Sequence, residues 1–149
     1  MKKIAGFTLV EMMVVVAVFA IMAAVAIPAF MSLLPGMRLN GAARQVAGDL
    51  MAARMKAVKL NQDTKVFFTS SSQYSICDDA DNDGTVVFGE GDVKNRNIQT
   101  EYHDVTLTKT ANPAFQARGT SSGTTVTVTN PSGSKKDVKV AFTGRVKID

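Results

Sequence analysis

The chain has 149 residues and a formal net charge of +4 at pH 7; 46% of its residues are hydrophobic and 20% are charged. This length suits one membrane helix and one small domain of roughly 90 residues, and it leaves no room for a second domain. Because Cys77 is the only cysteine, an internal disulfide is excluded and the domain must be held by packing or by another staple.

An apolar run without any charged residue extends over residues 12–37, and one acidic residue, Glu11, stands just before it. About 20 apolar residues at ~1.5 Å rise span the ~30 Å hydrocarbon core of a bilayer, so the run predicts a membrane-spanning helix. A carboxylate inside such a helix costs roughly 2.5 to 3.5 kcal/mol and usually marks a paired or functional site. If the chain were cut after Gly6, the new ammonium of Phe7 would lie about one helical turn from Glu11 and neutralise it. The simpler alternative is that Glu11 extends to the membrane interface.

The string Lys3-Ile4-Ala5-Gly6-Phe7-Thr8-Leu9-Val10-Glu11 resembles the prepilin cleavage and methylation signal of type IV pilins and type II secretion pseudopilins. The resemblance implies cleavage between Gly6 and Phe7 by a prepilin peptidase, N-methylation of Phe7, and Glu11 as the assembly carboxylate. The lysines before the site fit the positive-inside bias that would hold the leader in the cytoplasm. The alternative is an ordinary secretory signal cut near Ala24-Val25-Ala26, which leaves Glu11 and the Gly6-Phe7 junction unexplained.

An amphipathic helix is predicted over residues 37–61, because apolar residues recur three or four positions apart and should cover a sheet. These residues are Leu39, Ala42, Val46, Leu50, Ala53, Ala57 and Leu60. The basic residues of the segment, among them Arg54 and Lys56, lie largely off this stripe and are interpreted as a solvated face. The amino-acid sequence of residues 42–45 and 53–62 resembles that of the H-type minor pseudopilin and FimT-like minor pilin family.

Short β-prone and alternating runs predict that residues 62–149 form a β-rich head. The expected strands are 64–68, 73–77, 85–88, 103–108, 124–129, 137–142 and 145–148. Turn residues at 69–72 and 130–134 are expected to join neighbouring strands. The stretch around Pro113 and residues 121–123 is a loop that the pattern does not place.

The segment 77–104 is acidic between two basic segments, and its residues from Asp79 to Glu90 fit the calcium-loop pattern D-x-[DN]-x-[DN]-G-x5-E. The expected Ca²⁺ ligands are the carboxylates of Asp79, Asp81 and Asp83, a backbone carbonyl of Thr85 and a bidentate carboxylate of Glu90. Calcium would replace the missing disulfide as a staple. The alternative is a solvated acidic turn, because β runs rather than EF-hand helices flank the loop.

The C-terminal Thr143-Gly144-Arg145-Val146-Lys147-Ile148 contains a second candidate site. If Val146 and Ile148 face the core, strand alternation directs Arg145 and Lys147 outward together. The run resembles the C-terminal Gly-Arg-x-Arg motif associated with DNA binding in FimT-like minor pilins, with Lys147 in place of the second arginine. Lysine retains the charge but loses the bidentate fork, and no aromatic residue is expected nearby for base stacking. The alternative is a basic edge strand that resists aggregation.

The chain is not expected to be an enzyme, because neither His103 nor Cys77 stands in a motif with a nucleophile, a base and an orienting group. The expected fold class is α+β and type IV pilin-like, with a long N-terminal helix packed on a small antiparallel β-rich head. The expected parts are a leader at 1–6, a transmembrane and assembly helix at 7–36, and a periplasmic head at 37–149.

The resemblance implies a minor pilin or pseudopilin of a type II secretion pseudopilus or a type IV pilus. Such a chain would cross the bacterial inner membrane once, and its partners would be other pilins, the prepilin peptidase and an inner-membrane assembly platform. Two alternatives stay open: a DNA-binding minor pilin for DNA uptake, and a major pilin that lacks the usual disulfide.

Overall fold

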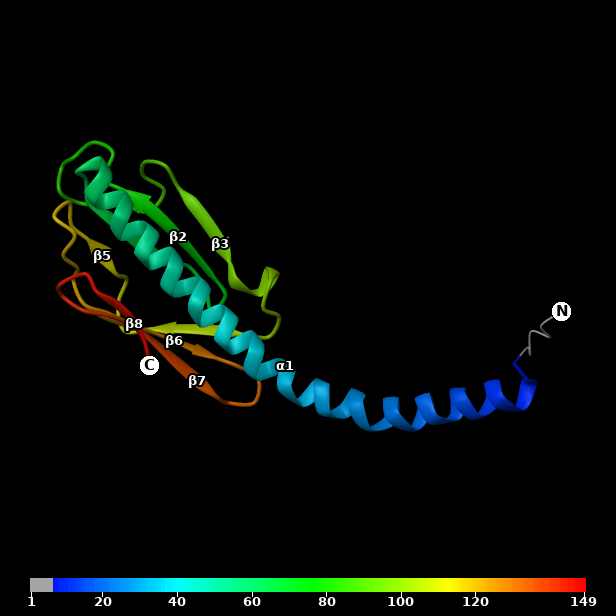
Figure 1. Cartoon of the computed structure of the whole chain (residues 1–149). Coiled ribbons are helices and arrows are strands. Elements are labelled where there is room, and N and C mark those ends of the chain that lie inside the picture. The colour runs from blue at the N-terminus through cyan, green and yellow to red at the C-terminus, as the bar shows by residue number, and fades with distance from the viewer. Residues whose placement is uncertain (1–6) are drawn as a thin grey trace. The chain divides into compact units, whose positions relative to one another are not determined.

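The computed structural model describes residues 7–149, which form one long helix followed by β-strands and a short 3-10 turn (Figure 1). The helix α1 covers Leu9–Leu60. The other elements are β1 (Thr64–Phe68), β2 (Gln73–Asp78), β3 (Lys94–Asn97), η1 (Ile98–Thr100), β4 (Thr106–Lys109), β5 (Ala114–Phe115), β6 (Thr124–Thr129), β7 (Lys135–Val140) and β8 (Val146–Ile148). The predicted leader, 1–6, lies outside the described residues. The chain divides into two compact units, the first ending at Leu34 and the second beginning at Pro35.

The first unit contains the apolar part of α1. Every residue from 7 to 33 is exposed, although nearly all of them are apolar. The helix is long and apolar enough to cross a membrane. A helix that is apolar on all sides and is left uncovered by the rest of residues 7–149 suits lipid or neighbouring helices as its surroundings.

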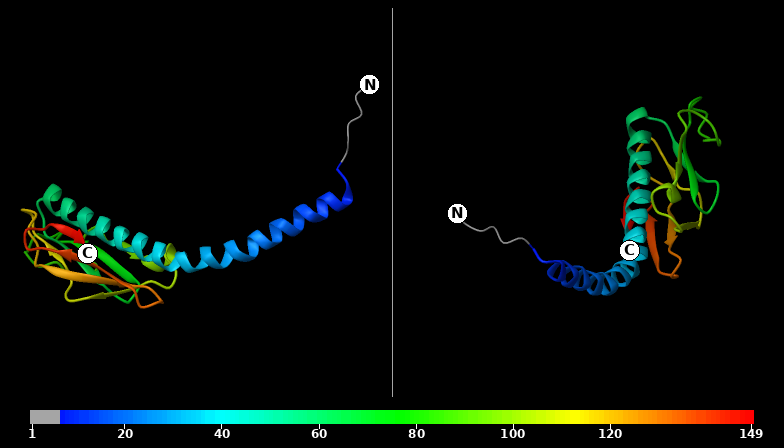
Figure 2. Two further views of the ribbon diagram at one scale, coloured as in Figure 1. Left: turned by 60° about the horizontal axis from the view of Figure 1, so that its bottom comes forward. Right: turned by 90° about the vertical axis from the view of Figure 1, so that its right-hand side faces the viewer.

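The second unit, the head, packs the later turns of α1 against two antiparallel sheets, as the views in Figures 1 and 2 show. Sheet A has the strand order β3-β2-β1-β5, and sheet B has the order β4-β6-β7-β8. Helix residues such as Leu50 and sheet residues such as Val126 and Phe115 belong to a single buried core. The predicted α+β class, with a long helix on a small antiparallel head, is therefore confirmed.

The predicted apolar stripe of the helix is buried from Leu39 to Ala57, whereas Leu60, at the end of α1, is 44% exposed. The expected strands 64–68 and 124–129 coincide with β1 and β6, and those at 73–77, 103–108, 137–142 and 145–148 overlap β2, β4, β7 and β8. The sole cysteine, Cys77, is fully buried in β2, as expected of a small apolar side chain.

The predicted strand at 85–88 is wrong, because local carboxylates take the backbone donors that a sheet would need. The N–H of Thr85 donates to Asp83 over 2.7 Å, and that of Val87 donates to Glu90 over 2.8 Å. Two glycines with φ near +88°, one on either side, turn the chain away from an extended path. The segment is consequently part of a loop.

Two basic side chains of α1 are fixed to loops, so the prediction that they form a solvated face is wrong for both. Arg54 Nε donates to the carbonyl of Gly119 over 2.9 Å, and its Nη2 reaches the carbonyl of Thr143 at 3.4 Å. Lys56 Nζ donates to Asp78 Oδ1 over 2.6 Å and to the Asp92 carbonyl over 2.9 Å. The helix thus holds loops that belong to both sheets.

Candidate functional site

At the start of α1, Thr8 and Glu11 form a reciprocal pair of hydrogen bonds. The N–H of Glu11 donates to Thr8 Oγ1 over 3.2 Å, and the N–H of Thr8 donates to Glu11 Oε2 over 3.4 Å. This is a capping box, which satisfies backbone donors at the helix N-terminus and places negative charge where the helix dipole favours it. The Thr-x-x-Glu spacing before an apolar run was the signal in the sequence, and it was missed. Of the predicted processing residues, Phe7 is exposed and Gly6 lies outside the described residues.

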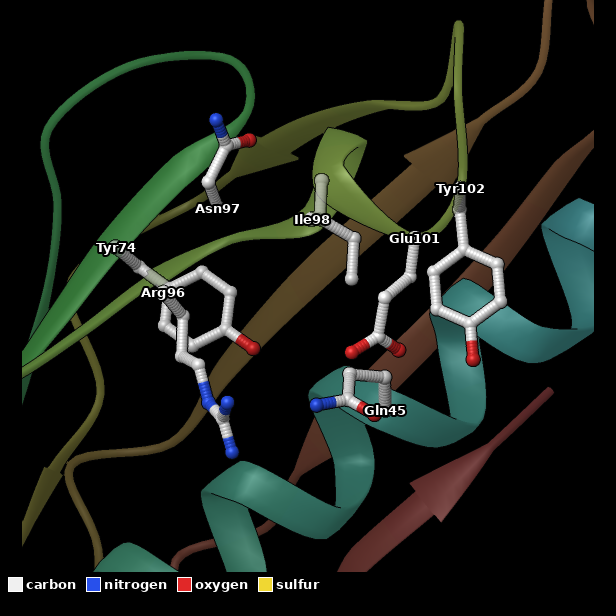
Figure 3. Close-up of a pocket in the computed structure, with 7 residues that line it drawn as sticks. All are labelled: Gln45, Tyr74, Arg96, Asn97, Ile98, Glu101 and Tyr102. Carbon is white, nitrogen blue, oxygen red and sulfur yellow. The ribbon is translucent and has the colours of Figure 1, made fainter.

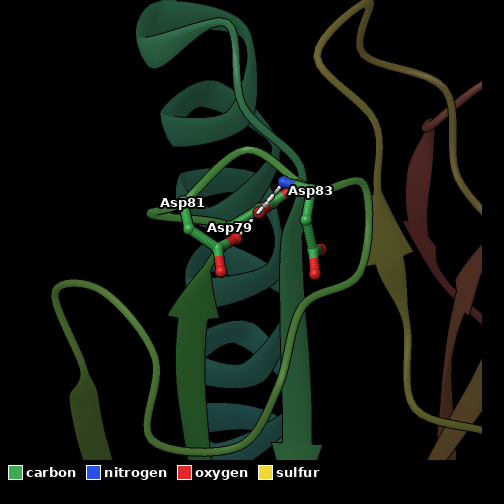
Figure 4. A group of neighbouring side chains, drawn as sticks. All are labelled: Asp79, Asp81 and Asp83. Carbon is green, nitrogen blue, oxygen red and sulfur yellow. Dashed lines mark hydrogen bonds between the residues drawn. The ribbon is translucent and has the colours of Figure 1, made fainter.

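In the acidic loop, the side chains of Asp79, Asp81 and Asp83 lie close together (Figure 4). One oxygen from each lies within 4.8 Å of the others. Asp79 is buried, and its two oxygens accept hydrogen bonds from the N–H groups of Asp83 and Gly84 over 3.1 and 2.8 Å. Oxygen ligands gathered in this way suit a hard divalent cation such as Ca²⁺.

Glu90, the predicted bidentate ligand, accepts hydrogen bonds from the backbone of the loop. Its two oxygens accept hydrogen bonds from the N–H groups of Ala80 and Val87 over 2.9 and 2.8 Å, so the side chain closes the loop across its width. The three aspartates are therefore brought together without Glu90 among them. The pKa of Asp81 is raised: a hydrogen bond from the backbone of Asp83 lowers it, but desolvation and the neighbouring negative charges outweigh that effect.

The base of the loop is tied to α1 by Lys56. Its ammonium lies 2.6 Å from the carboxylate of Asp78, at the end of β2, and 3.1 Å from that of Asp92, where the loop returns. Burial by itself lowers the pKa of Lys56, but the hydrogen bonds to Asp78 and Asp92 outweigh it and the pKa is raised. The ammonium therefore keeps its charge, and both ends of the loop keep their place on the helix.

At the C-terminus, Val146 is buried while Arg145 and Lys147 are exposed, as strand alternation predicted. Lys147 pairs with Lys139 across β7 and β8, and the ammonium groups of both lysines contact the carboxylate of Asp149. Their hydrogen bonds lower the pKa of Asp149 to about 2, so this carboxylate stays charged and offsets part of the basic edge. Among these basic residues, Arg145 makes no ion pair within residues 7–149.

Beside this edge, sheet B carries an open groove of about 540 Å³. It is lined by Thr110, Gly123, Thr124, Thr125, Lys139, Val140, Ala141, Phe142, Arg145 and Lys147. The expectation that no aromatic residue lies near Arg145 and Lys147 is wrong, because the turn after β7 brings Phe142 to them, 76% exposed. Gly144, with φ of +77°, closes that turn by donating to the carbonyl of Ala141 over 2.8 Å.

A polar cluster that sequence reasoning missed joins Asp49 of α1 to Tyr74 and Arg96 of sheet A; Figure 3 shows Tyr74 and Arg96 in the pocket beside it. The hydroxyl of Tyr74 donates to Asp49 Oδ2 over 2.6 Å, and Arg96 Nε lies 3.4 Å from the same oxygen. Burial, followed by the hydrogen bond to Asp49, raises the pKa of Tyr74. Within hydrogen-bond reach of these groups there is no nucleophile paired with a base in residues 7–149, and the cluster serves to neutralise a buried carboxylate.

Comparison with known proteins gave matches at two levels. The family model described as type II transport protein GspH matches residues 42–144, and the prokaryotic N-terminal methylation motif matches residues 1–27. No curated protein sequence gave a match.

Solved structures of two similar proteins share the fold. One is the type IV minor pilin FimU of Pseudomonas aeruginosa, with 16% identity and a TM-score of 0.58 over 74% of this chain and 87% of that one. The other is the minor pseudopilin EpsH from the Type 2 Secretion System of Vibrio cholerae, with 11% identity and a TM-score of 0.58 over 75% of this chain and 96% of that one.

Proposed function

Because this chain belongs to the type II transport protein GspH family, we propose that it acts as a processed minor subunit of a type II secretion pseudopilus or type IV pilus. Its role is structural. The observation that carries the proposal is that one helix, α1, contains both an exposed apolar segment and the segment that packs in the head. An exposed apolar helix with an N-terminal methylation motif leads directly into the helix that forms the core of the head.

In this proposal the chain is inserted once in the bacterial inner membrane with its head in the periplasm. A prepilin peptidase cleaves between Gly6 and Phe7 and the amine of Phe7 is methylated. The apolar part of α1 then packs against other pilins, with help from an inner-membrane assembly platform. What supports these steps is the exposed apolar surface of residues 7–33, which has no partner within the described chain and needs lipid or other helices to cover it.

Mass spectrometry of the protein from its own membranes tests the processing step. We expect a chain that begins at Phe7 and carries one added methyl group. Replacing Gly6 with leucine should leave the leader attached, because a bulky side chain enters the cleavage junction. Gly36→Leu is the matched control, since the space around Gly36 is open, and it should be cleaved normally. If the chain without substitutions still began at Met1, the proposal would be contradicted.

The acidic loop is proposed as a Ca²⁺ site, with Asp79, Asp81 and Asp83 as the ligands best supported by their geometry. Calcium would relieve the repulsion among carboxylates that share a cluster within 4.8 Å. Thr85 and Glu90 were predicted as further ligands. In this proposal the Glu90 side chain has to exchange at least one of its hydrogen bonds to the loop backbone for the cation.

Calcium is expected to stabilise the full chain in detergent by about 2.7 kcal/mol at 100 times its dissociation constant. EGTA should therefore lower the melting temperature. The double variant Asp81→Asn/Asp83→Asn should lose this response because it removes two of the three clustered carboxylates. Both side chains are exposed, and the asparagine oxygens can still accept the hydrogen bonds from the backbone of Asp83 and Thr85. Asp104→Asn, an exposed acidic residue outside the loop, should keep it. If the chain without substitutions melted at the same temperature in calcium and in EGTA, the acidic loop would not be a calcium site.

DNA binding by Arg145 and Lys147 remains a prediction and is not adopted as the function. The exposed ring of Phe142 favours it, because bases stack on aromatic rings, but Asp149 lies against two of the lysines and would repel phosphate. If DNA were the ligand, the full chain would retard single-stranded DNA at low salt, and Arg145→Ala/Lys147→Ala would abolish the shift. Lys135→Ala/Lys136→Ala is the matched control on the same sheet.

A further inference from the structure

The groove on sheet B has small residues and one aromatic ring at one end. Gly123, just before β6, and Ala141, just after β7, leave this end without bulky side chains. The ring of Phe142 lies against Gly123, since a Cβ added at Gly123 would stand 3.0 Å from the ring atom Cε1. Phe142 is nevertheless 76% exposed. The ring is thus positioned by a backbone contact and still open to a ligand.

Polar side chains line the other end of the groove. Thr125, Lys139 and Lys147 are paired across β6, β7 and β8, so they form one row on the same face of the sheet (Figure 1). Both lysines share the carboxylate of Asp149. Arg145 lies two residues before Lys147 on the same face and makes no ion pair within residues 7–149. Its guanidinium is therefore available to an anionic ligand.

An aromatic ring, hydroxyl groups and a guanidinium in an open groove of about 540 Å³ together match a sugar that carries an acid. The C–H face of a pyranose ring packs on an aromatic face, which is electron-rich. Sugar hydroxyls donate and accept hydrogen bonds, as threonine hydroxyls do. A carboxylate on the sugar accepts two parallel hydrogen bonds from a guanidinium.

We propose that the groove binds a segment of an acidic polysaccharide, with a sugar ring on Phe142, sugar hydroxyls at Thr125 and a uronate carboxylate at Arg145. The inference goes beyond the proposed structural role. It gives the head a ligand whichever filament contains it.

Peptides and nucleic acids fit the groove less well. An extended peptide gains much of its affinity by pairing with a free strand edge, but the main chains of β6 and β7 are already paired on both sides. A nucleic acid carries a phosphate on every unit, and Asp149 already shares the lysines that would neutralise these charges. A glycan with a carboxylate on alternate sugars needs only a separated cation such as Arg145.

Isothermal titration calorimetry of the full chain in detergent tests the proposal. The ligand is a hyaluronan hexasaccharide, in which glucuronate alternates with N-acetylglucosamine. EGTA is present, so that calcium at the acidic loop cannot link protein and glycan. We expect saturable binding at low salt. The neutral N-acetylglucosamine hexamer has sugar rings without carboxylates, and hexaglutamate has carboxylates without sugar rings. Each should bind about tenfold more weakly or not at all.

Substitutions in the groove locate the binding. Arg145→Ala should weaken hyaluronan binding by about tenfold, because it removes charge-assisted hydrogen bonds. Phe142→Ala should weaken it about fivefold, whereas Phe142→Tyr keeps the ring and should bind normally. Lys135→Ala is the matched control, since it removes one positive charge from the other end of β7, and it should also bind normally. Circular dichroism verifies the fold of each variant.

Three results would overturn the proposal. The first is the absence of hyaluronan binding, or binding that Arg145→Ala leaves unchanged. The second is equal binding of hexaglutamate or of the neutral hexamer. The third is tighter binding of a thymidine oligonucleotide that the same substitutions abolish, which would assign the groove to nucleic acid. None of them contradicts the role as a filament subunit, which N-terminal processing and filament content test separately.

Discussion

Replacing Glu11 with alanine is expected to leave membrane insertion and cleavage intact and to exclude the chain from filaments. Insertion should not suffer, because the substitution removes a carboxylate whose placement in an apolar helix costs roughly 2.5 to 3.5 kcal/mol. Assembly should fail, because the ammonium of a mature Phe7 would enter an apolar helix bundle without its counter-charge. The measurement is the amount of the chain in sheared filaments relative to the amount in membranes, which we expect to fall at least tenfold.

The capping box gives a competing explanation of Glu11, and one conservative variant separates the two. Glutamine can replace glutamate in a capping box because its side-chain oxygen also accepts the Thr8 N–H. If helix capping is the purpose, Glu11→Gln should assemble normally and Thr8→Ala should assemble poorly. If the negative charge is the purpose, Glu11→Gln should fail as Glu11→Ala does, whereas Thr8→Ala should lose only the ~1 kcal/mol of a helix cap. Normal filament content in both Glu11 variants would contradict the assembly role.

Asp49→Ala is expected to destabilise the head by about 3 kcal/mol, the largest effect that we predict for a single polar residue of the core. The carboxylate accepts the Tyr74 hydroxyl over 2.6 Å and lies 3.4 Å from Arg96, so its loss leaves a buried hydroxyl and a cation without their partner. The effect should fall at the lower end of the range for broken buried pairs, because the Arg96 side chain is 38% exposed. Urea unfolding followed by circular dichroism measures it.

Two variants check the Asp49 prediction. Tyr74→Phe removes only the hydroxyl and should cost less than Asp49→Ala, because the carboxylate keeps Arg96. Asp104→Asn should cost almost nothing, since the contact of Asp104 with Arg38 is 3.9 Å long, its side chain is 70% exposed, and asparagine tolerates its φ of 65°. Equal losses for Asp49→Ala and Asp104→Asn would show that the cluster contributes no more than a surface pair.

The pH dependence of stability follows from Tyr74. Its pKa in the folded head is raised above its ordinary value of 10.0, chiefly by burial. The folded state therefore retains a proton that the unfolded chain releases above pH 10, and the stability that this proton supplies is present below pH 10 and lost as the pH rises further. Tyr74→Phe should remove this part of the alkaline decline in the urea midpoint.

Sequence patterns predicted a helix or strand correctly where the spacing of apolar residues matched the buried side of that element. The three- and four-residue spacing in α1 and the alternation in β6 follow directly from which side of an element faces the core. They failed for β3, whose residues Lys-Asn-Arg-Asn include no apolar side chain because the strand lies at the edge of sheet A. They also failed for β5, which has only two residues and pairs with the first two residues of β1.

The candidate sites divide in the same way. Glu11 and the three clustered aspartates stand in local motifs, so spacing alone located them. The Asp49 cluster and the groove join residues that are distant in the sequence, such as Asp49 with Arg96 and Thr125 with Lys147. Such groupings depend on how the helix and the sheets pack, which no local pattern records.

The hydrogen bonds of Arg54 and Lys56, which fix loops to α1, bear on how this head can be engineered. Arg54 and Lys56 are separated by one residue, yet the first holds the loops around Gly119 and Thr143 while the second holds both ends of the acidic loop. A foreign peptide that replaced the exposed residues between Asp78 and Asp92 would keep both attachments to Lys56 at its base, but it would remove the proposed calcium site.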